Sequence, residues 1–392
     1  MTSILRSRGG LAAAGIAATA GLLGHYAAYC DEKLGIGHDR PMARPERVSD
    51  LDGFSLESIA LGDNATAAIT REGTLYTWGS GAYGRLGHGD ESSLNLPRRN
   101  EHLSGRRIVQ VALGGFHALA LDDQGSVYSW GRALAAGQDS RDNVYIPSQV
   151  RGELDNVKVQ AVAAGRLHCA AVGEDGSVYT WGNNMEGELG QGDKRNRTVP
   201  KRVQGLQDKR AVNVACGRDF TLVLLDDGTL YSCGADDYGQ LGLGRGHDQR
   251  YVTIPSRVVG GLAEVKEVVA GDYHSCAVTQ SGAVFTWGIG REGQLGHGEK
   301  SDQAIPKKVD GLDDVEVEQV CCGGGHSGAI SSSGELYLWG RGRDGQLGRE
   351  GELESIAAYR LVPTRVESLR TFYVIQAGLG SDHSAVLAKM KD

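Results

Sequence analysis

The sequence has few prolines, few aromatic residues and no excess of positive charge. Of its 392 residues only 8 are proline and 6% are aromatic, whereas 59 are glycine. So little proline argues against a Gly/Pro-rich disordered chain, and the glycines indicate many tight turns between short strands. The 41 basic and 49 acidic residues give a net charge of -8, which argues against sequence-independent binding to duplex DNA.

Catalytic and metal-binding motifs are also missing. The 7 cysteines include no C-x-x-C pair, so a zinc or redox site is not indicated, and an odd number without a framework favours reduced, buried thiols. The sequence contains no Gly-x-x-x-x-Gly-Lys-Ser/Thr, Gly-x-Ser-x-Gly or His-Glu-x-x-His motif. We therefore predict neither enzymatic activity nor a cofactor.

Three markers instead recur with a period of about 50 residues. The first is a Trp-Gly pair, which becomes Cys-Gly in one unit: Trp78-Gly79, Trp130-Gly131, Trp181-Gly182, Cys233-Gly234, Trp287-Gly288 and Trp339-Gly340. The second is the glycine of an Ala-x-Gly-x-x-His pattern: Gly62, Gly114, Gly165, Gly217, Gly271, Gly323 and Gly378. The third is a proline: Pro45, Pro97, Pro147, Pro200, Pro255, Pro306 and Pro363.

Within a unit the pattern is that of short strands. Apolar runs such as Val265–Val268 are bounded by Gly, Asp and Ser, and Asp175-Gly176 is typical of a two-residue hairpin turn. No segment after residue 40 keeps a helical apolar period. Each unit is therefore predicted to form about four short antiparallel strands. Because one such sheet cannot bury its faces alone, the units are expected to stack as an all-β propeller.

The repeat resembles that of the regulator of chromosome condensation family. Its hallmark Tyr-x-Trp-Gly-x-x-x-x-x-Gly-Gln-Leu-Gly is seen as Phe285–Gly296, and the resemblance covers roughly residues 44–390. It implies a seven-bladed propeller, which agrees with the seven prolines and seven glycines. Only six Trp-Gly strands exist, so one blade is expected to lack a strand. We expect Ser384–Leu387 to close the ring by joining the strands after Pro45.

Five histidines share one repeat position, and a ring of metal ligands is the tempting interpretation. They are His117, His168, His274, His326 and His383. Spaced one blade apart, they are not expected to converge within the 2–2.2 Å that a metal requires. Ala65 and Phe220 also interrupt the set. We therefore predict a structural hydrogen-bonding role, and a packing role between blades for the tryptophans.

A less uniform pattern is a set of basic residues two positions after the repeat prolines. They are Arg47, Arg99, Arg202, Arg257, Lys308 and Arg365, with Gln149 in the remaining unit. The simpler interpretation is solvated charge that protects an outer strand. The sharper one is a basic rim that binds an acidic protein partner. Unit 2 also departs from the repeat, because Arg132–Gln138 replaces the Gly-Gln-Leu-Gly turn.

Residues 1–40 match no repeat, which sets a domain boundary before a propeller at 41–392. Arg6 and Arg8 precede the uncharged stretch 11–29, and no acidic residue occurs before Asp31. Three interpretations remain open: a mitochondrial presequence, a membrane anchor that associates the protein with the bilayer, or a secretory signal. The mitochondrial interpretation is favoured, with the protein optionally tethered at the inner membrane. Secretory and nuclear locations are the alternatives.

The resemblance leaves two functions in competition. The first is a non-catalytic protein-interaction scaffold in mitochondria, for example in the assembly of a ribosome or respiratory complex. The second is a guanine-nucleotide exchange factor for a small GTPase, which needs no acid–base chemistry. The family's photoreceptor motif Gly-Trp-Arg-His-Thr is absent. Fold alone does not decide between the two functions.

Overall fold

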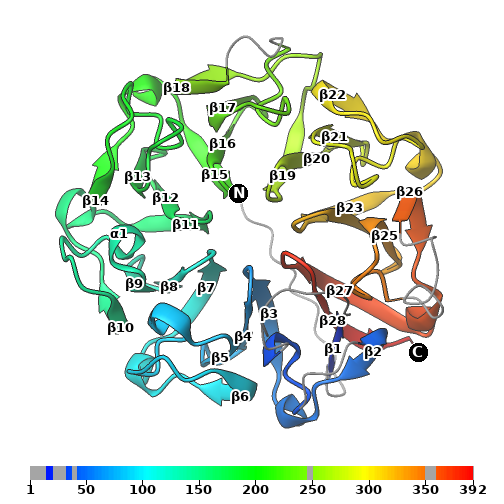
Figure 1. Ribbon diagram of the computed structural model, residues 1–392, viewed down its shortest axis with the longest axis horizontal. Coiled ribbons are helices and arrows are strands. Elements are labelled where there is room, and N and C mark those ends of the chain that lie inside the picture. The colour runs from blue at the N-terminus through cyan, green and yellow to red at the C-terminus, as the bar shows by residue number, and fades with distance from the viewer. Residues whose placement is uncertain (1–14, 21–31, 38–41, 245–249, 349–358, 392) are drawn as a thin grey trace, which may run out of the picture.

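The computed structural model describes residues 15–20, 32–37, 42–244, 250–348 and 359–391. Short antiparallel sheets are arranged around a common axis (Figure 1). In six of the sheets the strand that comes first in the sequence is the innermost one. Six sheets, here called blades 1 to 6, each consist of four strands that are consecutive in the sequence. One further sheet combines strands from both chain ends and is called the closing sheet.

The strands of blades 1 to 3 have the following bounds. Blade 1 contains β3 (Leu56–Leu61), β4 (Ala65–Thr70), β5 (Leu75–Gly79) and β6 (Leu94–Arg99). Blade 2 contains β7 (Ile108–Leu113), β8 (His117–Asp122), β9 (Val127–Gly131) and β10 (Val144–Gln149). Blade 3 contains β11 (Val159–Ala164), β12 (His168–Gly173), β13 (Val178–Gly182) and β14 (Arg197–Arg202).

Blades 4 to 6 repeat this arrangement. Blade 4 contains β15 (Ala211–Cys216), β16 (Phe220–Leu225), β17 (Leu230–Ala235) and β18 (Tyr251–Arg257). Blade 5 contains β19 (Val265–Ala270), β20 (His274–Thr279), β21 (Val284–Gly288) and β22 (Gln303–Lys308). Blade 6 contains β23 (Val317–Cys322), β24 (His326–Ser331), β25 (Leu336–Arg341) and β26 (Tyr359–Arg365).

Helical structure in the described residues is limited to single turns. The 3-10 turns are η1 (Glu32–Leu34), η2 (Ser49–Leu51), η3 (Ala82–Gly84), η4 (Glu101–Leu103), η5 (Gly152–Leu154), η6 (Gln204–Leu206), η7 (Asp310–Leu312) and η8 (Glu367–Leu369). The α-helical turn α1 (Ala133–Ala136) lies in blade 2. No helix in the part of the chain that the structure describes is long and apolar enough to cross a membrane.

Two glycine markers are explained by close approaches of the backbone. A Cβ added at Gly271 would lie 2.3 Å from the Gly323 carbonyl oxygen and 2.5 Å from Cε1 of His274. Gly288 has φ +102°, and a Cβ there would lie 2.6 Å from the Tyr273 carbonyl oxygen. The first glycine therefore admits the neighbouring blade and a histidine ring, and the second allows a left-handed turn after the tryptophan.

The closing sheet has the order β2-β1-β28-β27. Its strands are β1 (Gly15–Ala20), β2 (Met42–Arg47), β27 (Phe372–Leu379) and β28 (Ser384–Met390). Both chain ends thus contribute, as expected. The expected direct pairing of Ser384–Leu387 with strands after Pro45 is wrong, because β28 pairs with β1, and β1 in turn pairs with β2.

This arrangement corrects the predicted fold class. The expectation was seven blades, one of them a strand short and made from both chain ends, preceded by a separate N-terminal segment. Instead, six blades are built from consecutive repeat strands, and the closing sheet has a full four strands because residues 15–20 supply the missing one. The remainder of the stretch 11–29 lies outside the described residues.

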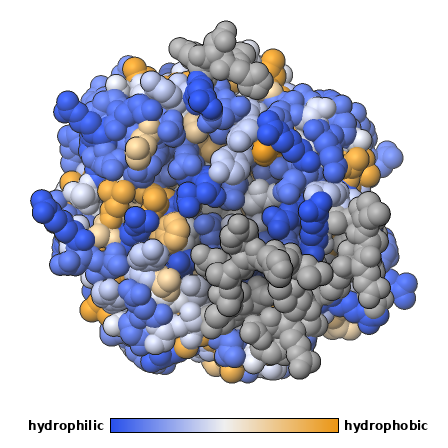
Figure 2. All heavy atoms as spheres, viewed as in Figure 1, coloured by the Kyte–Doolittle hydropathy of each residue, from blue (hydrophilic) through white to orange (hydrophobic). Residues whose placement is uncertain are grey.

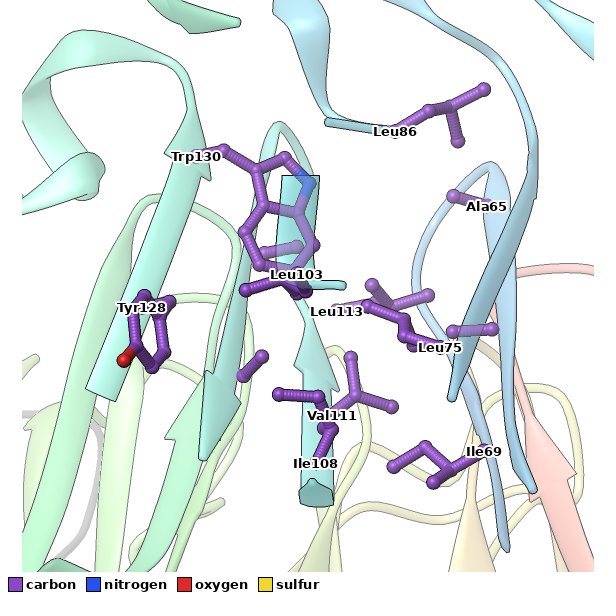
Figure 3. Close-up of a cluster of buried hydrophobic side chains, with 13 residues drawn as sticks. Ala65, Ile69, Leu75, Leu86, Leu103, Ile108, Val111, Leu113, Tyr128 and Trp130 are labelled. Atoms are coloured by element: carbon purple, nitrogen blue, oxygen red, sulfur yellow. The ribbon is translucent and has the colours of Figure 1, made fainter. Parts of the chain in front are cut away.

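Hydrophobic clusters fill the spaces between neighbouring sheets. Between blades 1 and 2, the indole of Trp130 is fully buried against residues such as Leu86, Leu103 and Val111 (Figure 3). A comparable cluster joins blade 1 to the closing sheet through Trp78 and Leu387. The tryptophans therefore pack between blades, as the sequence predicted.

Candidate functional site

The six basic residues of the predicted rim lie far out on the propeller. Each ends the fourth strand of its own sheet, so they are distributed around the circumference: Arg47 ends β2, Arg99 ends β6, Arg202 ends β14, Arg257 ends β18, Lys308 ends β22 and Arg365 ends β26. Several are neutralised locally. Distances between charged atoms are 2.7 Å for Arg47–Asp52, 2.5 Å for Lys308–Asp313 and 3.0 Å for Arg365–Glu335. Their role as a partner-binding rim stays a prediction.

The five histidines form hydrogen bonds from one sheet to the next. Nε2 of His274 lies 2.8 Å from Oγ of Ser327, and Nε2 of His168 lies 3.0 Å from Oγ1 of Thr221. Since the Ser327 hydroxyl donates to the Gln294 carbonyl oxygen at 2.8 Å, Nε2–H of His274 is the donor to it. The remaining contacts are His117 to Cys169, His326 to Ser384 and His383 to Thr66. The structural role predicted for these side chains is confirmed by these contacts.

The tryptophan ring nitrogens complete this network. Nε1 of Trp339 donates to the Gln294 carbonyl oxygen at 2.9 Å, the same oxygen that accepts from Ser327. In the closing sheet the equivalent oxygen belongs to Lys33, which accepts from Trp78 at 3.0 Å and from Thr66 at 2.8 Å. Lys33 therefore occupies the repeat position of Gln294, and residues 32–37 form part of the propeller.

Burial keeps four of these histidines neutral. It lowers the pKa of His117, His326 and His383 to about 3 and that of His168 to about 4. Each ring is buried, and its Nδ1 has no hydrogen-bond partner among the described residues. These rings belong to the interior, which leaves the loops as the place where a ligand could bind.

The most varied loops lie at one mouth of the axial channel. Turns after the innermost strands line a cavity of about 100 Å³ there. This is smaller than typical small-molecule sites of roughly 300–1,000 Å³. Blades 3 and 4 supply Arg166 and Arg218 to the mouth, whereas blades 1 and 5 supply Asp63 and Asp272. Burial raises the pKa of Asp272 to about 6. Arginines and aspartates thus line the same narrow mouth, where Arg218 lies 3.8 Å from Asp272.

An arginine–aromatic cluster lies beside the mouth, on the loops of blades 1, 2 and 3. Three guanidinium groups surround the Phe116 ring, with centroid distances of 5.2 Å for Arg85, 5.6 Å for Arg132 and 5.7 Å for Arg166. The Tyr83 ring meets Phe116 edge to face at 5.4 Å. We call these five residues the Phe116 cluster. Cation–π attraction of this kind is stronger where water is excluded.

A second cluster on the same type of loop differs in its charge balance. Arg291 lies 5.0 Å from the Tyr238 ring centroid, but its guanidinium also pairs with Asp302 at 3.2 Å. Arg218 near Tyr273 likewise lies 3.8 Å from Asp272. Within the described ranges no such ion pair is formed by Arg85, Arg132 or Arg166. The guanidinium groups of the Phe116 cluster are therefore held by aromatic rings rather than by direct ion pairs, while the Asp63 carboxylate acts on Arg85 through space.

The departure of blade 2 from the repeat shapes this cluster. The turn α1 replaces the usual Gly-Gln-Leu-Gly loop, and the backbone N–H of Arg132 donates to the Phe116 carbonyl oxygen at 2.9 Å. Figure 2 shows apolar residues gathered on the visible face over α1 and the neighbouring β11 and β12. Leu134 and Leu167 are half-buried in these loops, and Met185 is 63% exposed. An apolar surface thus accompanies the arginines.

Comparisons with known proteins identify the family of this chain. A family model described as the RCC1-like domain matches residues 81–392, and a model of the regulator of chromosome condensation (RCC1) repeat matches residues 57–85. The ultraviolet-B receptor UVR8 of Arabidopsis thaliana is 38% identical over 324 residues, which are 81% of this chain and 72% of the receptor.

Two further comparisons concern a protein described as mitochondrial and a solved structure. The mitochondrial RCC1 domain-containing protein RUG3 of Arabidopsis thaliana is 33% identical over 332 residues, covering 82% of this chain and 74% of RUG3. The crystal structure of Prp20p from Saccharomyces cerevisiae superposes on this chain with a TM-score of 0.83 at 23% identity. Prp20p is described as binding Gsp1p and histones. The superposition covers 97% of this chain and 92% of Prp20p. This likeness supports the fold alone.

Proposed function

This chain belongs to the family of RCC1-like domains, and we propose that it acts as a non-catalytic protein-interaction scaffold. One observation carries the proposal. Repeats that are nearly uniform inside the propeller diverge at the channel mouth, where blade 2 presents the Phe116 cluster beside an apolar surface. Arginine and aromatic side chains of this kind are enriched at the centres of protein interfaces.

The small cavity supports protein binding over small-molecule binding. Its volume of about 100 Å³ would hold little more than a few waters, and its walls are largely backbone and glycine. A partner would therefore bind across the mouth rather than within it. Prp20p, which has this fold and is described as binding Gsp1p and histones, is consistent with such a use of the propeller.

We further propose a mitochondrial location. The basic, acid-free start of the sequence supports it, as does the similarity to RUG3, which is described as mitochondrial. Lys33 and Leu34 are 4% and 0% exposed, and Nζ of Lys33 lies 2.5 Å from Asp382. Residues 15–20 pair with β28 and β2, and residues 32–37 pack into the ring, so any cleavage of a targeting segment should occur before residue 15.

The test is affinity purification of the tagged full-length chain from isolated mitochondria, with mass spectrometry of its own N-terminus. We expect recovery of stable protein partners and a mature N-terminus before residue 15. A chain that stays outside mitochondria would contradict the location, and the absence of any specific partner would contradict the scaffold. Recovery of a small GTPase whose nucleotide release is accelerated would instead support the exchange-factor alternative.

A further inference from the structure

We propose that the Phe116 cluster binds an acidic segment of a protein partner, in which carboxylates flank a hydrophobic side chain. The inference rests on the proposed scaffold function and names the chemistry of its partner. The five residues that carry it are Tyr83, Arg85, Phe116, Arg132 and Arg166, brought together from blades 1, 2 and 3.

The first observation is a buried guanidinium that forms no direct ion pair among the described residues, although the Asp63 carboxylate acts on it through space. Arg85 is 4% exposed, and its Nη1 is a buried atom that has no hydrogen-bond partner in the described part of the chain. Its Nε donates to the Ala82 carbonyl oxygen at 3.1 Å. A buried guanidinium is costly unless a carboxylate or several acceptors compensate it. Burial accordingly lowers the pKa of Arg85.

The site of Lys33 in the closing sheet shows which carboxylate the site of Arg85 lacks. Arg85 and Lys33 both replace the repeat glutamine, as the carbonyl contacts of Lys33 to Trp78 and of Arg85 to Trp130 demonstrate. Lys33 pairs with Asp382 of its own sheet at 2.5 Å. The residue of blade 1 at the repeat position of Asp382 is Asn64, which has no charge. Arg85 therefore lacks the internal carboxylate that Lys33 has.

Two further guanidinium groups strengthen the positive field. Arg132 and Arg166 are half-buried around the Phe116 ring, and Arg132 also lies 5.5 Å from the Tyr83 ring centroid. Stacking on these rings preorganises the guanidinium planes without neutralising them. A carboxylate placed between Arg132 and Arg166 would gain charge-assisted hydrogen bonds from groups that are already oriented.

The surroundings select the class of partner. The chain carries a net charge of -8, and the mouth also presents Asp63 and Asp272. A long nucleic acid would meet repulsion from these carboxylates, whereas a short acidic peptide can lie over Arg132 and Arg166 alone. The exposed Met185 and the half-buried Leu134 and Leu167 offer apolar contact beside the arginines. Together these features favour a hydrophobic residue flanked by Glu or Asp.

The experiment measures binding of a fluorescein-labelled peptide of repeated Glu-Glu-Leu triplets to the purified full-length chain by fluorescence anisotropy. Matched peptides carry Gln for Glu, or Ser for Leu. We expect binding that weakens as salt is raised and that needs both Glu and Leu. Arg132→Gln and Arg85→Gln should each weaken it about tenfold, an effect of about 1.4 kcal/mol. Arg85→Gln restores the residue found in blades 4 to 6, so the variant should fold.

Two variants sharpen the result. Asn64→Asp supplies Arg85 with the carboxylate that Lys33 already has, so it should weaken peptide binding and raise the melting temperature. Arg291→Gln removes an arginine that is stacked on an aromatic ring but paired with Asp302, so binding should be unchanged. Circular dichroism would verify that each variant is folded.

Several outcomes would overturn the proposal. One is that the wild-type chain does not bind the peptide. Another is that Arg132→Gln and Arg85→Gln bind it as tightly as the wild-type chain does. A third is that Arg291→Gln weakens binding as much as these two variants do. If sedimentation shows a dimer that Arg132→Gln dissociates, the occupant is a second copy of the chain and the acidic segment is excluded. Each of these failures leaves the scaffold proposal to be judged by the recovery of mitochondrial partners.

Discussion

The spaces between blades and the loops at the channel mouth are encoded by the same repeats but behave differently. Between blades, a carbonyl oxygen accepts from a tryptophan and a hydroxyl at one sheet interface after another, as at Gln240, Gln294 and Lys33. At the mouth, the equivalent turns present Asp63, Phe116 or Gly324. Positions that touch the next blade are constrained by packing, whereas mouth positions can change without affecting the ring.

The largest effect is expected from the repeated interior. Trp287→Ala should lower the free energy of unfolding by about 4–5 kcal/mol, because it empties a fully buried site and removes the hydrogen bond to the Gln240 carbonyl oxygen. Cys233→Ala, at the same repeat position, should cost only about 1–2 kcal/mol because the thiol fills less space. Denaturant titration followed by circular dichroism measures both. If the two variants lost the same free energy of unfolding, the size of the buried side chain would not explain the difference between the two positions.

The network histidines predict a strong pH dependence. Their pKa is lowered from 6.5 to about 3 for His117, His326 and His383 and to about 4 for His168, so the unfolded chain binds more protons as the pH falls below 6.5. Stability should be fully present above pH 6.5 and be lost progressively towards pH 4. Each histidine contributes about 1.4 kcal/mol per pH unit in this range.

Two buried acids oppose this trend. Burial raises the pKa of Glu267 to about 7 and of Asp272 to about 6, which favours the folded state as the pH falls through these values. Near pH 5 the net loss should be about 2–3 kcal/mol per pH unit. Urea titrations between pH 7 and pH 5 measure it, and His326→Gln should reduce the slope. A stability that is constant or rises towards pH 5 would contradict the assignment of neutral histidines.

A smaller effect separates two serines of the network. Ser327→Ala leaves Nε2–H of His274 without an acceptor, whereas Ser275 follows the blade in which Phe220 replaces the histidine. Ser327→Ala should therefore cost about 1–2 kcal/mol more than Ser275→Ala. Parallel thermal denaturation tests the difference, and equal melting temperatures would show that the histidine bond adds nothing.

The smallest effect is expected at the outer rim. Neutralising Lys308 and Arg365 should leave stability nearly unchanged, because both form ion pairs that water and salt screen. If the rim assists an acidic partner, this variant should slow association about two- to threefold without changing dissociation. Stopped-flow measurements at two salt concentrations would separate the rates. If the partner dissociated faster from this variant, the rim would belong to the partner interface, which would contradict our assignment of that interface to the mouth.

The repeat markers predicted the blades well because each marker has one fixed packing role. The closing sheet was predicted less well, since Gly15–Ala20 has neither tryptophan nor proline and contributes through its backbone pairing. One signal was nevertheless present. Ten residues separate Gly35 from Pro45, the same spacing as between Gly296 and Pro306, and Leu34-Gly35 repeats Leu295-Gly296.

The candidate site required the fold. The replacement of the repeat glutamine by Arg85 is visible in Gly84-Arg85-Leu86-Gly87, as is the shortened loop of blade 2. Their convergence on Phe116 is not, because it depends on the approach of blades 1, 2 and 3 at the mouth. The basic residues that the sequence did single out recur at regular spacing along the chain, which distributes their side chains around the ring rather than bringing them together at the mouth.

The closing sheet also imposes an order on folding during synthesis. Gly15 pairs with Ala388, and Lys33 with Asp382, so the first strands to leave a ribosome have their partners among the last. Blades 1 to 6 can form one after another, but the ring stays open until the final residues emerge. Throughout that interval two surfaces are exposed to association with other chains: the edge of β1 that later pairs with β28, and the apolar face of blade 6 that later packs against the closing sheet. A chaperone that shields these surfaces would act most effectively just before chain release.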